Sequence, residues 1–233
     1  MAGQLPADDQ RELECLILAF LDDKIFEGAA GFEVTDEVRV TIAAQACVLL
    51  LHRDTDIYPD LDTIVVYPST YVAKTSTRDG EIVIEGESAR LGESWTRGLV
   101  VLAWDAALSG TTNVHDGHNV VLHEFAHQLD HEGGSMDGAP DLGARARYVT
   151  WAQVLGAEYT ELVARVERGR GADIDSYGAT SPPEFFAVVT EMFFEKPAQL
   201  RARHPDLYAA LSDFYKQDPA SLALPPREPR RER

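Results

Sequence analysis

Cysteine is scarce in this sequence. Its 233 residues include two cysteines, Cys15 and Cys47, each within an apolar helical pattern. Two cysteines do not form the disulfide framework of a small secreted domain, so we expect two buried free thiols. A hydrophobic core must then stabilise the chain, and 45% apolar residues at this length can supply one.

Positive charge is also in short supply. The chain has 21 Lys and Arg against 39 Asp and Glu, a formal net charge of -18 at pH 7. A surface of this sign repels polyanions. We therefore expect no binding to nucleic acid and none to an anionic membrane surface.

Long apolar runs are missing as well. No run approaches the roughly 18 residues that a membrane-spanning helix needs. The longest run near the N-terminus, residues 15–21, lies between acidic residues and follows no basic segment, unlike the core of a signal peptide. These features predict a soluble cytoplasmic protein.

The periodicity of apolar residues predicts one α+β domain that is mainly helical with a small mixed β-sheet. Helices are predicted at both ends of the chain, strands in the middle, and a loop containing Gly28 and Gly31 between the first two helices. The predicted helices lie near residues 13–21, 35–49, 118–131, 145–168 and 181–195, with two short ones after Pro197 and Pro205. The predicted strands are 63–67, 81–85 and 99–104. We assign residues 1–219 to the domain and 220–233 to a charged, proline-rich tail without fixed structure.

The helix predicted at 118–131 carries the pattern His-Glu-x-x-His, within VVLHEFAHQL at residues 120–129. Positions i and i+4 lie on one helix face, so His123 and His127 can hold one Zn²⁺ ion. Glu124 is rotated by about 100° from His123. It is therefore placed to act as a general base toward water whose pKa zinc lowers to about 7. The pattern is a metalloprotease signature, and the uncharged residues around it favour a buried helix over a chance pair of surface histidines.

A catalytic zinc needs a third protein ligand. His131 lies about 12 Å along the helix from His123 and cannot share one ion with both motif histidines. The metzincin extension is excluded, because Asp130 and Gly133 occupy the positions of its glycine and histidine. The third ligand must come from another element.

Glutamates on the later helices are the candidates for that ligand. Spacing favours Glu184, near the start of the helix at 181–195, over Glu158 on the helix at 145–168. Glu184 has a competing role, because Ser181-x-x-Glu184 is a capping box. From spacing alone, both the identity of the ligand and the role of Glu184 stay open.

Other polar residues near the motif have two interpretations each. Asp130 either orients an imidazole N–H of a ligand or is a solvated acid at the helix end. Glu191, on the same helix face as Glu184, either accepts a hydrogen bond from a ligand histidine or is a surface acid. We expect His115 and His118 to be solvated loop residues.

Three segments together resemble the Mlc titration factor A family of zinc peptidases. They are NVVLHEFAHQLD at 119–130, SPPEFFAVVTEMFFEKP at 181–197 and LSDFYKQDP at 211–219. The catalytic region of that family is similar to the metalloprotease domain of anthrax lethal factor, in which a Ser-Tyr-Gly segment precedes Glu-Phe-Phe-Ala. Here Ser-Tyr-Gly at 176–178 precedes Glu-Phe-Phe-Ala at 184–187. The resemblance implies a zincin-like metallopeptidase fold.

The resemblance also implies roles for individual residues. His123, His127 and Glu184 would bind one Zn²⁺ ion, Glu124 would be the general base, and Tyr177 would donate a hydrogen bond to the oxyanion. The implied activity is aminopeptidase-like hydrolysis of short peptides, with the strand at 99–104 as the edge that holds the substrate and residues 133–142 and 174–180 as rims. Some family members bind the glucose-responsive repressor Mlc. The alternative function is therefore a regulatory protein that binds such a repressor and whose zinc site is structural or conditionally active.

Overall fold

The computed structural model describes residues 5–69, 98–113 and 115–222. The strand predicted at 81–85 and most of the tail predicted from residue 220 lie outside these ranges. Within them the chain is mostly helical and carries a small sheet, which confirms the predicted α+β class.

The described sheet has three parallel strands in the order β1-β2-β3. The predicted strands at 63–67 and 99–104 are confirmed as β2 and β3, although β3 ends one residue early at Ala103. The sheet was predicted to be mixed, whereas every described strand pair is parallel. Their bounds are β1 Ile25–Gly28, β2 Thr63–Tyr67 and β3 Leu99–Ala103.

Strand β1 corrects the prediction of a loop between the first two helices. Its sequence, IFEG, is too short and too exposed to show the alternation of a buried strand. Backbone pairing with β2 makes it a strand, starting where the Ile25 amide donates to the Asp62 carbonyl at 3.0 Å. Its last residue is Gly28, and a Cβ at that position would lie 1.8 Å from the Phe32 carbonyl oxygen, so this close return of the chain requires glycine.

The long predicted helices are confirmed, and two short helices were missed, α3 and α9, the second of which covers the start of the predicted tail. Helix α3 begins at Trp104, directly after β3, and its sequence WDAALSGTT has weak helix signals because it contains Gly110 and two threonines. The predicted helix near residue 35 is capped by Thr35, whose hydroxyl accepts from the Val38 amide. The helices are α1 Ala7–Asp23, α2 Asp36–Val48, α3 Trp104–Thr112, α4 Val120–Glu132, α5 Arg145–Glu167, α6 Pro182–Glu195, α7 Pro197–Arg203, α8 Pro205–Tyr215 and α9 Pro219–Leu222.

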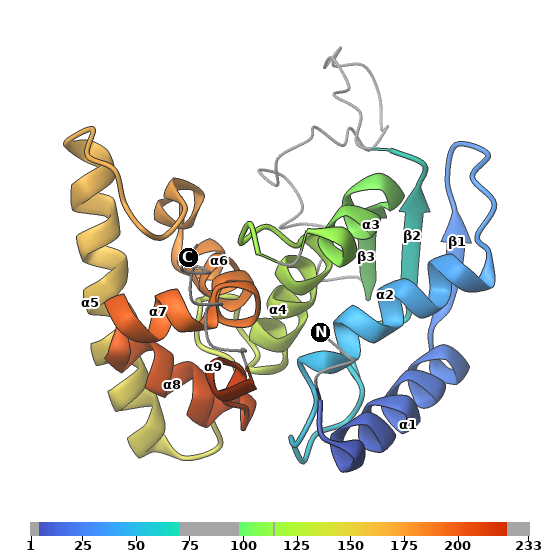
Figure 1. Cartoon of the computed structure of the whole chain (residues 1–233), viewed down its shortest axis with the longest axis horizontal. Coiled ribbons are helices and arrows are strands. Elements are labelled where there is room, and N and C mark those ends of the chain that lie inside the picture. The colour runs from blue at the N-terminus through green and yellow to red at the C-terminus, as the bar shows by residue number, and fades with distance from the viewer. Residues whose placement is uncertain (1–4, 70–97, 114, 223–233) are drawn as a thin grey trace, which may run out of the picture.

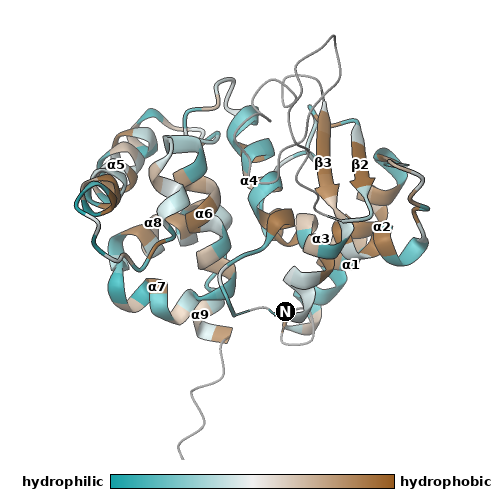
Figure 2. Ribbon diagram, turned by 90° about the horizontal axis from the view of Figure 1, so that it is seen from above, coloured by the Kyte–Doolittle hydropathy of each residue, from teal (hydrophilic) through white to brown (hydrophobic). Residues whose placement is uncertain are grey.

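Helix α4 lies between two groups of elements. The sheet with α1, α2 and α3 is on one side, and α5 to α9 are on the other (Figure 1). The view from above shows the same division, with β3 hydrophobic along its length and β2 hydrophobic over part of it (Figure 2). Residues 121–130 of α4 and 185–195 of α6 are all buried, and the two helices pack against each other. Polar side chains on these two helices must therefore find partners within the protein.

The two cysteines are both free thiols, but they differ in burial. Cys47 is buried as predicted. The prediction is wrong for Cys15, which is exposed on α1 because the inward face of that helix is formed by Leu13 and Phe20. None of the helices in the described ranges combines the length and apolar character required to cross a membrane.

Candidate metal centre

Helix α4 presents both motif histidines toward α6. The helix starts after Asn119, whose side-chain oxygen accepts from the Leu122 amide at 3.1 Å. The ring centroids of His123 and His127 are 5.0 Å apart, as expected for neighbours one turn apart on one face. Both side chains are almost completely buried, with exposed fractions of 9% and 3%.

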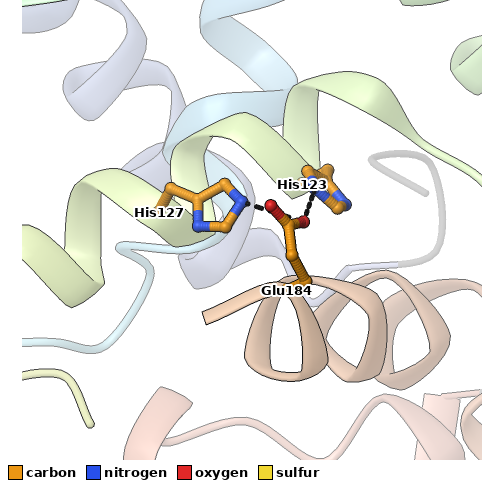
Figure 3. A group of neighbouring side chains, drawn as sticks. All are labelled: His123, His127 and Glu184. Atoms are coloured by element: carbon orange, nitrogen blue, oxygen red, sulfur yellow. Dashed lines mark hydrogen bonds and ion pairs between the residues drawn. The ribbon is translucent and has the colours of Figure 1, made fainter. Parts of the chain in front are cut away.

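The Glu184 carboxylate lies against both rings (Figure 3). Its Oε2 atom is 3.0 Å from Nε2 of His123 and 3.4 Å from Nε2 of His127. The capping box is only half formed: the Ser181 hydroxyl accepts from the Glu184 amide at 3.4 Å, while the carboxylate faces the histidines. One ligand atom from each of the three residues lies within 4.8 Å of the others, so together they could hold a metal ion.

The competing ligand candidates are engaged elsewhere. Glu158 bonds to Nδ1 of His204 at 2.8 Å. His131 faces Asp60, with its Nδ1 atom 3.6 Å from a carboxylate oxygen. His115 and His118 are exposed, as expected of loop residues. Among the described residues only Glu184 joins the motif histidines in a group of three possible ligands.

Glu191 contacts the first motif histidine, so the surface-acid interpretation is wrong. Nδ1 of His123 lies 2.7 Å from Oε1 of Glu191, and the Asn119 amide donates to the other carboxylate oxygen. If a metal ion displaced the proton on Nε2, the Nδ1 proton shared with Glu191 would leave the Nε2 lone pair of His123 directed at the point near Glu184. Asn119 was not predicted to contribute, although its position before an apolar helical run is the signal of an N-cap.

Asp130 is fully buried, so it is not a solvated acid. Its Oδ2 atom accepts from the Gly138 amide at 2.9 Å. Burial raises the pKa of this carboxyl to about 7, against the opposing effect of that hydrogen bond. Asp130 thus holds the loop between α4 and α5 that was predicted as a rim of the site.

Glu124 is buried beside the ligand group. Its Oε2 atom has no hydrogen-bond partner among the described residues. Burial raises the pKa of Glu124 to about 8, although the charge of His123 opposes the shift. A buried carboxylate oxygen without a hydrogen-bond partner is uncommon in a protein interior. It is typical of a group that binds a ligand or exchanges a proton.

The electrostatics of the ligand group suit a cation. Burial disfavours charge on Glu184, but hydrogen bonds from His123 and His127 outweigh it and lower its pKa to about 2. Burial likewise disfavours charge on His123, yet its contacts with Glu184 and Glu191 raise its pKa to about 10. Burial lowers the pKa of His127. An ionised Glu184 carboxylate and a neutral His127 imidazole therefore lie where positive charge, carried here by a proton on His123, is stabilised.

A pocket of about 430 Å³ opens beside this group. His123, Glu124 and Glu191 contribute to its wall, and so does Tyr177. Tyr177 belongs to η4, a 3₁₀-helix at Ser176–Ala179 that Asp175 caps by accepting from the Tyr177 amide at 2.7 Å. The ring centroids of Tyr177 and His123 are 6.0 Å apart. The structure thus brings all five predicted site residues to one place.

Two imidazoles from one helix, a carboxylate from a second and a free carboxylate at a pocket are the arrangement of the metallopeptidase class. Comparison with known proteins gives the same class. The model of the family described as glucose-regulated metallo-peptidase M90 matches residues 1–216, and the chain belongs to this family.

Several relatives match along nearly the whole chain. An uncharacterized protein of Synechocystis sp. (strain ATCC 27184 / PCC 6803 / Kazusa) is 46% identical over 219 residues, which cover 93% of this chain and 80% of the relative. A protein named Mlc titration factor A from Serratia proteamaculans is 31% identical, covering 92% of this chain and 83% of its own. A protein of that name from Klebsiella pneumoniae is 30% identical, covering 93% and 82%. These matches confirm the resemblance found in the sequence.

Proposed function

We propose that this chain is a zinc-dependent peptidase that hydrolyses short peptides in the manner of an aminopeptidase. The convergence of His123, His127 and Glu184 beside the orphaned Glu124 carboxylate is the observation that carries the proposal. One carboxylate and two imidazoles are a common ligand set for catalytic zinc. Membership of a metallopeptidase family supports a metal ion, and the nitrogen-rich ligand set favours zinc.

Each site residue has a defined task in this proposal. The ion would act as a Lewis acid and lower the pKa of water to about 7. Glu124 takes the proton of the attacking water and returns it to the leaving amine, for which a pKa of about 8 is well matched. Glu191 keeps the Nε2 lone pair of His123 pointed at the ion through the contact with Nδ1. The Tyr177 hydroxyl donates a hydrogen bond to the oxyanion as it develops.

The sheet edge supplies a place for the peptide backbone. Among the described strands β3 lies at the edge next to α3 and α4, and it was predicted to hold the substrate. An extended peptide would add to this edge as a further strand. Two free thiols are consistent with the cytoplasmic location that we propose.

Glu124→Gln tests the peptidase proposal most simply. The amide keeps the size of the side chain but cannot accept a proton, so turnover should fall by at least about a hundredfold, the range of general-base catalysis. Zinc content should stay near one ion per chain, because Glu124 is not in the ligand group. The measurement is cleavage of a peptide library by the zinc-loaded protein, with metal analysis of each variant. Equal cleavage by wild type and Glu124→Gln would refute the general-base role.

A second candidate function is regulatory. Relatives named Mlc titration factor A, in a family described as glucose-regulated, favour a transcriptional repressor resembling Mlc as partner. In this alternative the zinc site is structural or becomes active only when the partner binds. It would be supported if the zinc-loaded protein cleaved no library peptide but bound a purified repressor of that type, and it fails if no binding is measured.

A further inference from the structure

A second pocket adjoins the candidate metal centre. It has a volume of about 450 Å³ and shares several wall residues with the first pocket, among them Gly117, Asp175 and Val188. Its apolar wall includes Ile174, Val188 and Met192, which are all nearly buried. A ligand in the first pocket can therefore extend into the second along the same helix, α6.

Two cations line the second pocket, Lys196 and Arg170. Within the part of the chain that the structure describes, no ion pair joins either of them to a carboxylate. This is unusual in a protein whose acidic residues outnumber its basic ones by 39 to 21.

The acidic residues of the second pocket, by contrast, already have partners. Asp173 pairs with Arg203, and Asp175 accepts from the Tyr177 amide. Asp116 accepts from the His118 amide at 2.9 Å. The amide hydrogen bonds hold Asp116 and Asp175 in place without cancelling their charge, so the wall carries charges of both signs. Lys196 and Arg170 are the charged groups of this wall without a partner among the described residues, and an anion would supply one.

Lys196 is held at the junction of the two pockets. Its side chain lies along the backbone of Gly117, where an added Cβ would come within 2.9 Å of Nζ and 3.1 Å of Cε. Gly117 adopts a left-handed conformation with φ of 81° and donates its amide to Glu195 at 2.9 Å. Lys196 is half-buried, and its contact with the Gly117 backbone restricts the position of its ammonium group.

We infer that Lys196, with Arg170, binds a carboxylate of the peptide substrate, and that the apolar wall takes the residue bearing it. A charge-assisted hydrogen bond to a partly desolvated ammonium gives both affinity and orientation. The carboxylate belongs either to the C-terminus of the peptide or to an acidic side chain. This inference rests on the proposed peptidase function and narrows it to short peptides that carry a carboxylate.

Binding to the zinc-loaded Glu124→Gln variant tests the inference without requiring turnover. The probe is the pentapeptide Ala-Ala-Ala-Ala-Phe as free acid and as C-terminal amide, measured by calorimetry at low salt. The acid should bind at least about tenfold more tightly than the amide. Adding Lys196→Met, which keeps the apolar stem but not the charge, should bring this ratio close to one, and Lys196→Arg should restore most of it.

A control and a third peptide complete the experiment. Arg168→Met removes a nearby exposed charge that does not line the pocket, so it should leave the ratio unchanged. The amide of Ala-Ala-Ala-Ala-Glu carries its carboxylate on a side chain. If it binds as tightly as the free acid, Lys196 recognises a side-chain carboxylate; if it binds as weakly as the Phe amide, Lys196 recognises the C-terminus.

The two proposals fail in different ways. Equal affinity for acid and amide, or a preference that survives Lys196→Met, overturns the carboxylate subsite even if wild type is an active peptidase. The opposite outcome is also distinguishable. If the preference for the acid over the amide depends on Lys196 but the wild type cleaves no peptide, the carboxylate subsite is supported and the peptidase activity is overturned.

Discussion

At the scale of single residues, the site depends on where each buried charge finds a partner. Sequence spacing placed His123 and His127 on one face, because i and i+4 geometry is a property of the helix alone. It could not choose between Glu184 and Glu158, because that choice depends on how α4, α5 and α6 pack. The structure separates them: Glu184 faces the two rings, and Glu158 bonds to His204.

Glu191→Gln should weaken zinc binding by about ten- to a hundredfold, the usual effect of removing a carboxylate behind a ligand histidine. The amide can still contact Nδ1 of His123 but does not raise the basicity of the ring. The measurement is zinc affinity by competition with a chelating dye. Glu158→Gln is the matched control, since this carboxylate also bonds to a histidine but lies outside the ligand group. Equal affinities for wild type and Glu191→Gln would contradict the assigned role.

At the scale of elements, the periodicity of apolar residues predicted the long helices correctly but did not predict the short helices and strands reliably. The confirmed helices α1, α2, α5 and α6 each have at least 13 residues and a regular apolar face. Strand β1, with four residues, owes its conformation to pairing with β2 and not to its own sequence. A local sequence pattern does not show which strand a segment will pair with. For the same reason, the parallel direction of the strands could not be predicted from the sequence.

The loop between α4 and α5 fixes how the two ligand-bearing helices meet. Its Gly138 donates its amide to Asp130 at the end of α4 and accepts at 2.8 Å from Nε1 of Trp151 on α5. A Cβ on Gly138 would lie 2.6 Å from the carbonyl oxygen of Pro182, two residues before Glu184. This close approach couples the loop to the first turn of α6.

Gly138→Ala should therefore displace the start of α6 and lower zinc affinity by about tenfold or more, because metal ligands tolerate only small shifts. Gly134→Ala is the matched control. Both glycines have positive φ, 79° and 90°, but nothing lies within 4 Å of a Cβ at Gly134. Both variants should lose about 1–2 kcal/mol of unfolding free energy through backbone strain. If Gly134→Ala weakened zinc binding as much as Gly138→Ala, strain and not the contact with Pro182 would be responsible.

At the scale of the whole molecule, the site lies where the sheet-containing half meets the helical half, with α4 between them (Figure 1). The single domain at residues 1–219 remains a prediction, and α9 begins at its predicted end. This arrangement buries several carboxyl groups besides those of the site. Burial raises the pKa values of Asp130, Glu132 and Glu195 to about 7 each.

Stability should consequently fall as pH rises from 5 to 8. A carboxyl group whose pKa is higher in the folded state than in the unfolded state stabilises the fold while protonated, below about pH 4.5. That contribution is lost as pH rises through about 7. Glu195→Gln should remove one such group and reduce the loss of unfolding free energy over this range by about 1–2 kcal/mol. The measurement is urea unfolding of both proteins at pH 5 and pH 8. Equal pH dependence in the two proteins would rule out this role of Glu195.

Anomalous diffraction at the zinc absorption edge, from crystals of the zinc-loaded protein, tests the central claim most directly. The account predicts one peak within about 2.0–2.2 Å of Nε2 of His123, Nε2 of His127 and a carboxylate oxygen of Glu184. Its fourth coordination position should face the pocket lined by Glu124 and Tyr177. A peak elsewhere, or a Glu184 side chain turned away from both rings, would contradict it.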